Sequence, residues 1–223
     1  MKSLLSVLRF SLIVVLTMSL FFSFNGCSKK EEPKEQAKVE QKQGGKATAT
    51  IENLKLGYSS EVKHASWYDA FAKQAQKENL AEVAAMFRAL SQSEKVHADN
   101  MVSLLKAKGV EPAAPTVEAP PAGKTKQYLK LALSSEGVEA ESMYPAFIQK
   151  AELEQDSVAA QMFKQTLEAD LRHGRLLKRA MEQETNISHL PYMMCPKCGY
   201  IIGSEKDEEC RVCKAKKETF KKL

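Results

Sequence analysis

The sequence has no cysteine to spare for a disulfide bond. It contains five cysteines, of which four form two CxxC pairs near the C-terminus and the fifth, Cys27, follows an N-terminal apolar run. The sequence also lacks a large excess of one charge. The net charge is only +5, and basic and acidic residues are interspersed. Nucleic-acid-binding domains carry clustered basic residues. The sequence therefore gives no sign of a nucleic-acid partner.

A long apolar run is missing as well. Residues 10–24 are almost wholly apolar, but a membrane-spanning helix needs about 20 such residues. A charged start, a short apolar run and a small residue before a cysteine are typical of an export signal. Residues 24–27, Phe-Asn-Gly-Cys, resemble the lipobox of bacterial lipoproteins, although Phe and Asn are atypical there. We expect a signal peptide over 1–26 and lipidation of Cys27; the alternative is an uncleaved N-terminal anchor.

In both cases the body of the chain is expected outside the cytoplasm, held to the periplasmic face of a bacterial membrane. Residues 27–49 are mostly Lys, Glu, Gln and Gly. This composition cannot bury a core and predicts a flexible tether. Which membrane holds the anchor is left open.

Four long helices are predicted within residues 50–186. Their ranges are 50–78, 80–108, 124–153 and 156–185. Between the second and third, Glu111–Gly123 contains four prolines and predicts an extended crossover. Short, long and short connections are typical of ferritin-like bundles with one long crossover. The predicted fold class is therefore all-α, a ferritin-like four-helix bundle with a small metal-binding domain after it.

The ends of these helices carry recognisable signals. Asn79 and Glu82 have the spacing of a capping box at the start of the second helix. Gly109 is expected to end that helix, and Asp156 or Ser157 to cap the fourth. The two halves of the bundle look alike, which indicates an internal duplication of a helical hairpin.

Every predicted helix has an apolar stripe that is interrupted by an acid and, three residues later, by a second acid or a histidine. The pairs are Glu61 and His64, Glu94 and His97, Glu136 and Glu139, and Asp170 and His173. Residues at i and i+3 share one helix face, so all four pairs point into the bundle. Unpaired buried carboxylates cost several kcal/mol each, about 3 or more, and two metal ions would compensate them. One such pair alone is usually a surface feature, but four indicate a di-iron or di-manganese centre.

The C-terminal segment, residues 189–223, carries the two CxxC pairs. Cys195 and Cys198 are separated by eleven residues from Cys210 and Cys213, and we call these four residues the tetrathiolate site. Two such turns facing each other supply four thiolates in a tetrahedron, which holds iron or zinc. A segment this short cannot build a core of its own, so we expect the metal to fold it. Two disulfides are the alternative and fit this spacing poorly.

Together these motifs resemble the rubrerythrin family, a ferritin-like di-iron bundle followed by a rubredoxin-like domain. The resemblance covers Asn53 to Phe220. The motifs that carry it are Glu61 with Tyr68, Glu94-Lys-Val-His97, Glu136-Gly-Val-Glu139, Met143-Tyr144-Pro145, Asp170-Leu-Arg-His173 and Cys195-Pro-Lys-Cys198-Gly199-Tyr200.

The resemblance implies a role for each matching residue at an oxo-bridged, non-haem di-iron centre. Glu61 and Glu136 would each chelate one iron, Glu94 and Asp170 would bridge, and His173 would bind one iron. His97 and Glu139 would alternate on the other iron as its oxidation state changes. Tyr68 and Tyr144 would hydrogen-bond the carboxylates. The tetrathiolate site would hold one iron, with zinc as the alternative.

Two positions depart from the family pattern. Asp170 replaces the family's bridging Glu and is one methylene shorter, so we expect either an asymmetric bridge or a changed spacing of the two metals. His64 occupies the place on the first helix that Glu139 occupies on the third. We hypothesise that His64 is an extra ligand or a close donor for the iron bound by His173; the alternative is a core histidine bonded to a neighbouring carboxylate.

The activity implied by the resemblance is reduction of hydrogen peroxide to water, with electrons relayed through a rubredoxin-type iron at the tetrathiolate site, as protection against oxidative stress. Family members also imply a homodimer in which each relay lies beside its partner's di-iron site. NADH is absent outside the inner membrane, so the donor is expected to be an exported c-type cytochrome or small iron–sulfur protein. The alternatives are a ferroxidase or oxygen-reducing oxidase, and a non-catalytic metal-binding lipoprotein.

Overall fold

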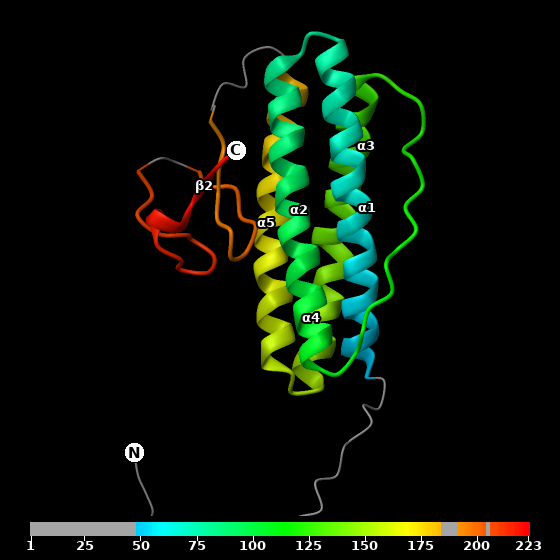
Figure 1. Ribbon diagram of the computed structural model, residues 1–223, viewed down its shortest axis with the longest axis vertical. Helices are drawn as coiled ribbons and strands as arrows, with labels where there is room; N and C mark the ends of the chain where they lie inside the picture. Colours follow the sequence, from blue (N-terminus) through cyan, green and yellow to red (C-terminus); the bar gives the residue numbers. More distant parts are fainter. Residues whose placement is uncertain (1–47, 184–190, 204–205) are drawn as a thin grey trace, which may run out of the picture. The chain divides into compact units, whose positions relative to one another are not determined.

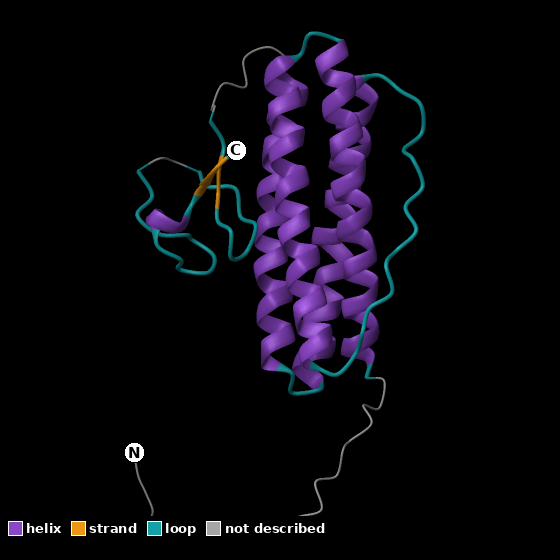
Figure 2. Ribbon diagram, viewed as in Figure 1, coloured by secondary structure: helices purple, strands orange, loops and turns teal. Residues whose placement is uncertain are grey.

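The computed structural model describes residues 48–183, 191–203 and 206–223. Within them, a helical bundle is followed by a small C-terminal unit (Figures 1 and 2). The helices are α1 (Ala49–Lys77), α2 (Ala81–Ala107), α3 (Thr125–Val138), α4 (Tyr144–Leu153) and α5 (Ser157–Gln183). Because α4 continues the column that α3 begins, the predicted four-helix bundle with one long crossover is confirmed.

The predicted signal peptide, the lipidation site Cys27 and nearly all of the tether lie outside the described residues. Among the helices that the structure does describe, none combines the length and the apolar character needed to cross a bilayer.

The helix ends correct one prediction and confirm two. Asn79 does not cap α2: it adopts φ 59°, and the N-cap residue Leu80 has no side-chain cap. Asn79 instead ends α1, because its N–H and that of Leu80 bond to the carbonyls of Gln76 and Ala75, the pattern of a Schellman motif. Gly109, with φ 76°, ends α2 as predicted.

Of the two predicted caps for the fourth helix, Asp156 and Ser157, the structure confirms Asp156. Its Oδ1 accepts from the Ala159 N–H at 3.1 Å. At the same turn, Glu154 accepts from the N–H groups of Ala49 and Thr50, both at 3.0 Å, and so caps the start of α1. These bonds join the first helix to the last connection of the bundle.

The third predicted helix is not continuous. A π-helical turn, Glu139–Met143, separates α3 from α4, and the Tyr144 N–H bonds to the Glu139 carbonyl. Pro145 follows and has no N–H to donate, so the regular hydrogen-bond ladder cannot run unbroken through this point. π-Helical turns are rare in proteins, and those that occur often lie at functional sites. This one begins at the predicted ligand Glu139.

Two of the three apolar clusters among the described residues form the core of the bundle. One cluster contains Phe71, Phe87 and Tyr128, and the other contains Met101 and Phe163. On each helix the predicted ligand pair lies between residues of one cluster and residues of the other. The polar level of the bundle is therefore sealed from both ends.

The C-terminal unit is small and has little regular structure. Strand β1 (Met193–Met194) pairs antiparallel with β2 (Lys221–Lys222), and a 3-10 turn, Lys217–Thr219, precedes β2. Tyr192, Met194 and Ile201 belong to the same apolar cluster as residues of the bundle.

Candidate metal centres

Six of the eight predicted bundle ligands gather at the polar level in two overlapping groups. One group is Glu61, Glu94 and His97, and the other is Glu94, Glu136, Asp170 and His173. Within each group the donor atoms lie within 4.8 Å of one another, and every member is buried. Because Glu94 belongs to both groups, the arrangement is that of two metal positions that share one carboxylate; the bridging role of Glu94 stays a prediction.

The two histidines mark the two metal positions. The Oε2 atom of Glu94 lies 2.8 Å from Nδ1 of His97, and its Oε1 atom lies 3.2 Å from Nδ1 of His173. Asp170 reaches both sides with one oxygen only, because Oδ1 lies 3.8 Å from each of the same two nitrogens. The shorter side chain thus faces both positions at equal distance and lies farther from both histidines than Glu94 does, so the asymmetry of the bridge stays a prediction.

The two predicted tyrosines contact the carboxylates crosswise. The hydroxyl of Tyr68 in α1 donates to Glu136 Oε1 at 2.5 Å, and the hydroxyl of Tyr144 in α4 donates to Glu61 Oε1. Burial and the nearby carboxylates raise the pKa of both phenols well above the usual range. Both therefore remain hydrogen-bond donors that fix the orientation of a ligand in the opposite half.

The buried carboxylates call for cations. Burial and the neighbouring acids raise the pKa of Asp170 well above its usual range, and neither of its oxygens has a hydrogen-bond partner in the described structure. Burial also raises the pKa of Glu94 to about 7. For Glu61 burial acts in the same direction, but the charge and hydrogen bond of His97 outweigh it and lower the pKa to about 2. Oxygen and imidazole donors with unpaired lone pairs fit two iron ions.

The Nε2 atoms of His97 and His173 are both linked to the C-terminal unit, one directly and one through Ser93. Nε2 of His97 lies 3.2 Å from the Cys198 carbonyl oxygen. Nε2 of His173 lies 2.9 Å from Ser93 Oγ, which donates to the Gly199 carbonyl at 2.7 Å. Each Nε2 must therefore carry a proton, which leaves Nδ1 as the atom that can bind metal.

Glu139 and His64, the remaining two predicted ligands, lie outside both groups and beside each other. His64 Nδ1 is 3.0 Å from Glu139 Oε2, and both side chains are buried. Burial lowers the pKa of His64, but the bond to Glu139 and the charges of the surrounding acids outweigh it and raise the pKa to about 9. This contact agrees with a histidine bonded to a neighbouring carboxylate; a metal-ligand role for His64 stays a prediction.

The four C-terminal cysteines form the predicted tetrathiolate site. Their sulfurs lie within 4.8 Å of one another, with Cys195 and Cys213 at 3.4 Å and Cys198 and Cys210 at 3.6 Å. These spacings are too long for disulfides and approach the edge of about 3.8 Å of a tetrahedron with metal–sulfur bonds of about 2.3 Å. The chain thus holds a Cys-bound metal besides the di-iron centre.

The loop that carries Cys198 fits closely against the bundle. Gly199 adopts φ 75°, and a Cβ there would lie 2.5 Å from His97 Nε2 and 3.0 Å from the Ser93 carbonyl oxygen. Only glycine therefore allows both this turn and this approach.

Two serines at the site escaped the sequence prediction. Ser93 joins His173 to Gly199, and Ser60 Oγ donates to Glu139 Oε1 at 2.5 Å. A signal was present, because Ser-Glu-x-x-His occurs at 60–64 and again at 93–97, and Ser-Glu-x-x-Glu at 135–139. The i, i+3 pattern of acid and partner does not include the serine that precedes the acid.

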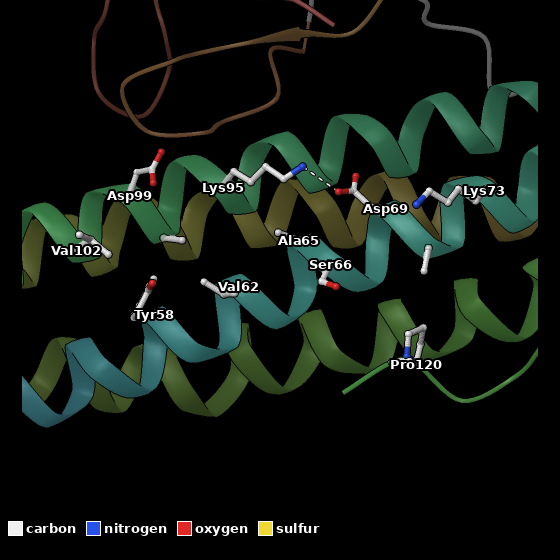
Figure 3. Close-up of a pocket in the computed structure, with 13 residues that line it drawn as sticks. Tyr58, Val62, Ala65, Ser66, Asp69, Lys73, Lys95, Asp99, Val102 and Pro120 are labelled. Atoms are coloured by element: carbon white, nitrogen blue, oxygen red, sulfur yellow. Dashed lines mark hydrogen bonds and ion pairs between the residues drawn. The ribbon is translucent and has the colours of Figure 1, made fainter. Parts of the chain in front are cut away.

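A separate groove of about 600 Å³ lies between α1 and α2 (Figure 3). Lys95 and Asp69 form an ion pair across it at 2.9 Å, and Pro120 of the crossover lies at its rim. The described residues that line this groove include none of the predicted ligands, so it is not part of the metal centre.

Comparisons with known proteins agree with this geometry. The sequence model of the family described as Rubrerythrin matches residues 52–181. Nigerythrin of Nitratidesulfovibrio vulgaris is 32% identical over 172 residues, which cover 77% of this chain and 85% of that protein. Rubrerythrin-2 of Clostridium acetobutylicum is 27% identical over 78% of this chain and 97% of its own length.

Solved structures give the same answer. The fully reduced, all-ferrous state of nigerythrin superposes with a TM-score of 0.74 at 30% identity, over 83% of this chain and 91% of that one. Fold, ligand groups, tetrathiolate site and sequence similarity all agree, and the chain belongs to the rubrerythrin family of di-iron oxidoreductases.

Proposed function

We propose that this protein is a peroxide reductase that protects an anaerobic or microaerophilic bacterium from oxidative stress. The observation that carries the proposal is the contact between its two metal sites. Cys198 is a predicted ligand of the Cys-bound metal, and its own carbonyl oxygen lies 3.2 Å from Nε2 of the predicted di-iron ligand His97. A storage or delivery protein has no use for such a link, whereas a reductase that must be re-reduced needs one.

The reaction consumes two electrons and two protons for each hydrogen peroxide and yields two waters; two ferrous ions in the bundle would supply the electrons. The part of the chain is to hold ligands of suitable charge. Glu94 and Asp170 lie between the two positions, and Glu61 and Glu136 each lie on one side. We expect His97 and Glu139 to alternate as ligands, because oxidised iron favours the anionic oxygen donor.

Electrons would return one at a time from the tetrathiolate site. From the sulfur of Cys198 the path follows its own side chain and carbonyl group to the N–H of His97. A second path leads from Gly199 through Ser93 to His173. Hydrogen bonds and burial around the thiolates tune the potential of such a site, and Cys195, Cys198 and Cys210 are all buried.

The place of action and the donor are part of the proposal. An export signal over residues 1–26 and a lipid on Cys27 would hold the enzyme on the periplasmic face of a membrane, where the donor is a c-type cytochrome or a small iron–sulfur protein. Mass spectrometry of the mature N-terminus tests the anchor. We further expect a homodimer, which sedimentation of the detergent-solubilised protein measures. The contact between His97 and Cys198 lies within one chain, so the proposed path differs from the relay between subunits that the resemblance implied.

The central experiment uses the full-length, iron-loaded protein, reduced without oxygen and mixed with peroxide in a stopped-flow instrument. We expect the visible charge-transfer band of the ferric tetrathiolate site to return rapidly, with two electrons leaving the protein per peroxide. A Cys210→Ala variant, in which the band should be absent, serves as the control for its assignment.

Other outcomes would point to the alternatives. Absence of the band in every redox state means zinc or no metal at the tetrathiolate site, and the relay proposal fails. Faster oxidation by dioxygen than by peroxide favours an oxidase, and turnover with added ferrous iron favours a ferroxidase.

A further inference from the structure

Glu139 is a predicted carboxylate ligand whose two oxygens are both engaged by side chains of another helix. Ser60 Oγ donates to Oε1 at 2.5 Å, and His64 Nδ1 lies 3.0 Å from Oε2. Ser60 and His64 are four residues apart on α1 and therefore share one face. The carboxylate is thus bound at two points, away from the groups that gather around the metal positions.

His64 is suited to this contact and to little else in the site. Its side chain is buried, and its ring stacks on Tyr68 at a centroid distance of 5.9 Å. Neither ring nitrogen makes a hydrogen bond of regular geometry among the described residues, so the 3.0 Å approach of Nδ1 to Glu139 Oε2 is the polar contact of the ring. An Nδ1–H is present in one neutral tautomer and in the imidazolium ion, so this contact can form in either charge state of the ring.

The repeated motif makes the contrast with His97 clear. His64 and His97 end the same pattern, Ser-Glu-x-x-His. His97 lies among the metal-facing donors, whereas His64 and its serine both contact Glu139. One copy of the motif supplies a ligand and the other holds a ligand of the opposite half.

We propose that Ser60 and His64 form a holding site for the Glu139 carboxylate in the state in which Glu139 is not a metal ligand. His64 is then a positioning residue that acts through Glu139. The inference rests on the proposed function in one respect, namely the exchange of His97 and Glu139 at one iron.

The holding site sets the balance of that exchange. On oxidation of the centre by two electrons, with an oxidant such as peroxide as the acceptor, Glu139 would leave Ser60 and His64 and bring one negative charge to the position that His97 would leave as a neutral ligand. Ser60 and His64 keep their protons, and reduction by two electrons reverses the change. Because the holding site stabilises only the state with Glu139 off the metal, it favours the ferrous form.

The test measures this balance without turnover. Full-length, iron-loaded protein is poised at fixed potentials, and Mössbauer spectra give the ferrous-to-ferric ratio of the di-iron centre separately from the tetrathiolate iron. His64→Ala should shift that ratio about tenfold toward ferric, the effect of losing one polar contact to a charged group. Ser60→Ala should shift it in the same direction.

His64→Asn separates holding from ligation. The Asn amide can donate from the place of Nδ1 but is a poor iron ligand, so we expect a near-normal ratio and unchanged iron content. Ser142→Ala is the matched control for Ser60→Ala, because Ser142 lies on the same π-helical turn as Glu139 and its hydroxyl donates to the Val138 carbonyl instead. It should leave the ratio unchanged.

Two results would overturn the inference. One is an unchanged ratio in His64→Ala. The other is a His64→Asn variant that matches His64→Ala and loses iron, which would make the imidazole itself a ligand. Neither depends on peroxide: a protein that peroxide fails to oxidise, yet whose variants shift as expected, contradicts the proposed function and leaves the holding site intact.

Discussion

The two halves of the bundle place the same kinds of residue at the same level and use them differently. In α1 and α2 the pairs are Glu61 with His64 and Glu94 with His97, whereas the second half has Glu136 with Glu139 and Asp170 with His173. A duplicated hairpin with identical ligands would give two equivalent metal positions. Here the first half supplies Glu94, which belongs to both donor groups. The second half supplies the shorter Asp170 and also Glu139, which belongs to neither group.

The difference extends to the contacts with the loop of the tetrathiolate site. His97 touches the Cys198 carbonyl directly, while His173 reaches Gly199 only through Ser93. The predicted duplication of a helical hairpin would account for where the ligands are, and divergence between the halves would account for how the two metal positions differ. Under the proposed function, one iron would have a direct link to the relay and the other a link through Ser93.

The largest effect is expected where the halves meet, at Glu94. Glu94→Ala removes the carboxylate common to both groups and leaves only the more distant Asp170, at 3.8 Å from each, facing both His97 and His173. We expect loss of both irons from the bundle and a fall in peroxide reduction of about 100-fold or more, beyond the effect typical of outer-sphere partners. Iron per chain and the stopped-flow rate measure it.

Glu168→Gln is the control for that variant, since Glu168 is exposed on α5 two residues before Asp170. It should change neither quantity. Retention of two bundle irons in Glu94→Ala would show that another residue can join the two positions.

A smaller effect is expected from separating the tetrathiolate loop from the bundle. Gly199→Ala strains a residue at φ 75° and brings a Cβ to 2.5 Å from His97 Nε2. The left-handed conformation alone costs a non-glycine residue about 1–2 kcal/mol, which lowers the docked fraction about tenfold. We expect the tetrathiolate band to persist while its reappearance after peroxide slows by at least that factor.

Gly203→Ala provides the comparison, because a Cβ there meets nothing nearer than Asp207 Oδ2 at 3.8 Å among the described residues. Equal slowing in both variants would mean that the loop as a whole, and not the contact with His97, governs the transfer.

Lengthening Asp170 should make the halves more alike. Asp170→Glu restores the methylene missing in α5 and lets the carboxylate approach both histidines, which Oδ1 now faces at 3.8 Å. We expect tighter iron binding by about 1 kcal/mol, a gain of several-fold. Competition with a chelator measures it, and weaker binding would show that the site is too closely packed for the added group.

The sequence was sufficient for whatever depends on periodicity and ligand type. Acids and histidines three residues apart on apolar stripes predicted the ligand level, and two CxxC pairs predicted the tetrathiolate site. The sequence was not sufficient where the same residue could either end one helix or cap the next. Asn79 had the spacing of a cap for α2, but its left-handed conformation ends α1. The π-helical turn at Glu139 and the roles of Ser60 and Ser93 depend on contacts between elements, which a pattern along one helix does not contain.

The smallest effect is expected at Ser93, where the second link to the relay can be cut alone. Ser93→Ala removes the acceptor of the His173 N–H and the donor to the Gly199 carbonyl, while the bond from His97 to Cys198 remains. Each hydrogen bond contributes about 1 kcal/mol net, so we expect a few-fold slower return of the tetrathiolate band and altered Mössbauer parameters for one bundle iron only. Ser135→Ala, at the same place in the motif of α3, has no side-chain hydrogen bond in the described structure to lose and should behave as the unaltered protein. If Ser93→Ala changed both irons equally, the two halves would be coupled through the bridging carboxylates more strongly than through their separate contacts with the tetrathiolate loop.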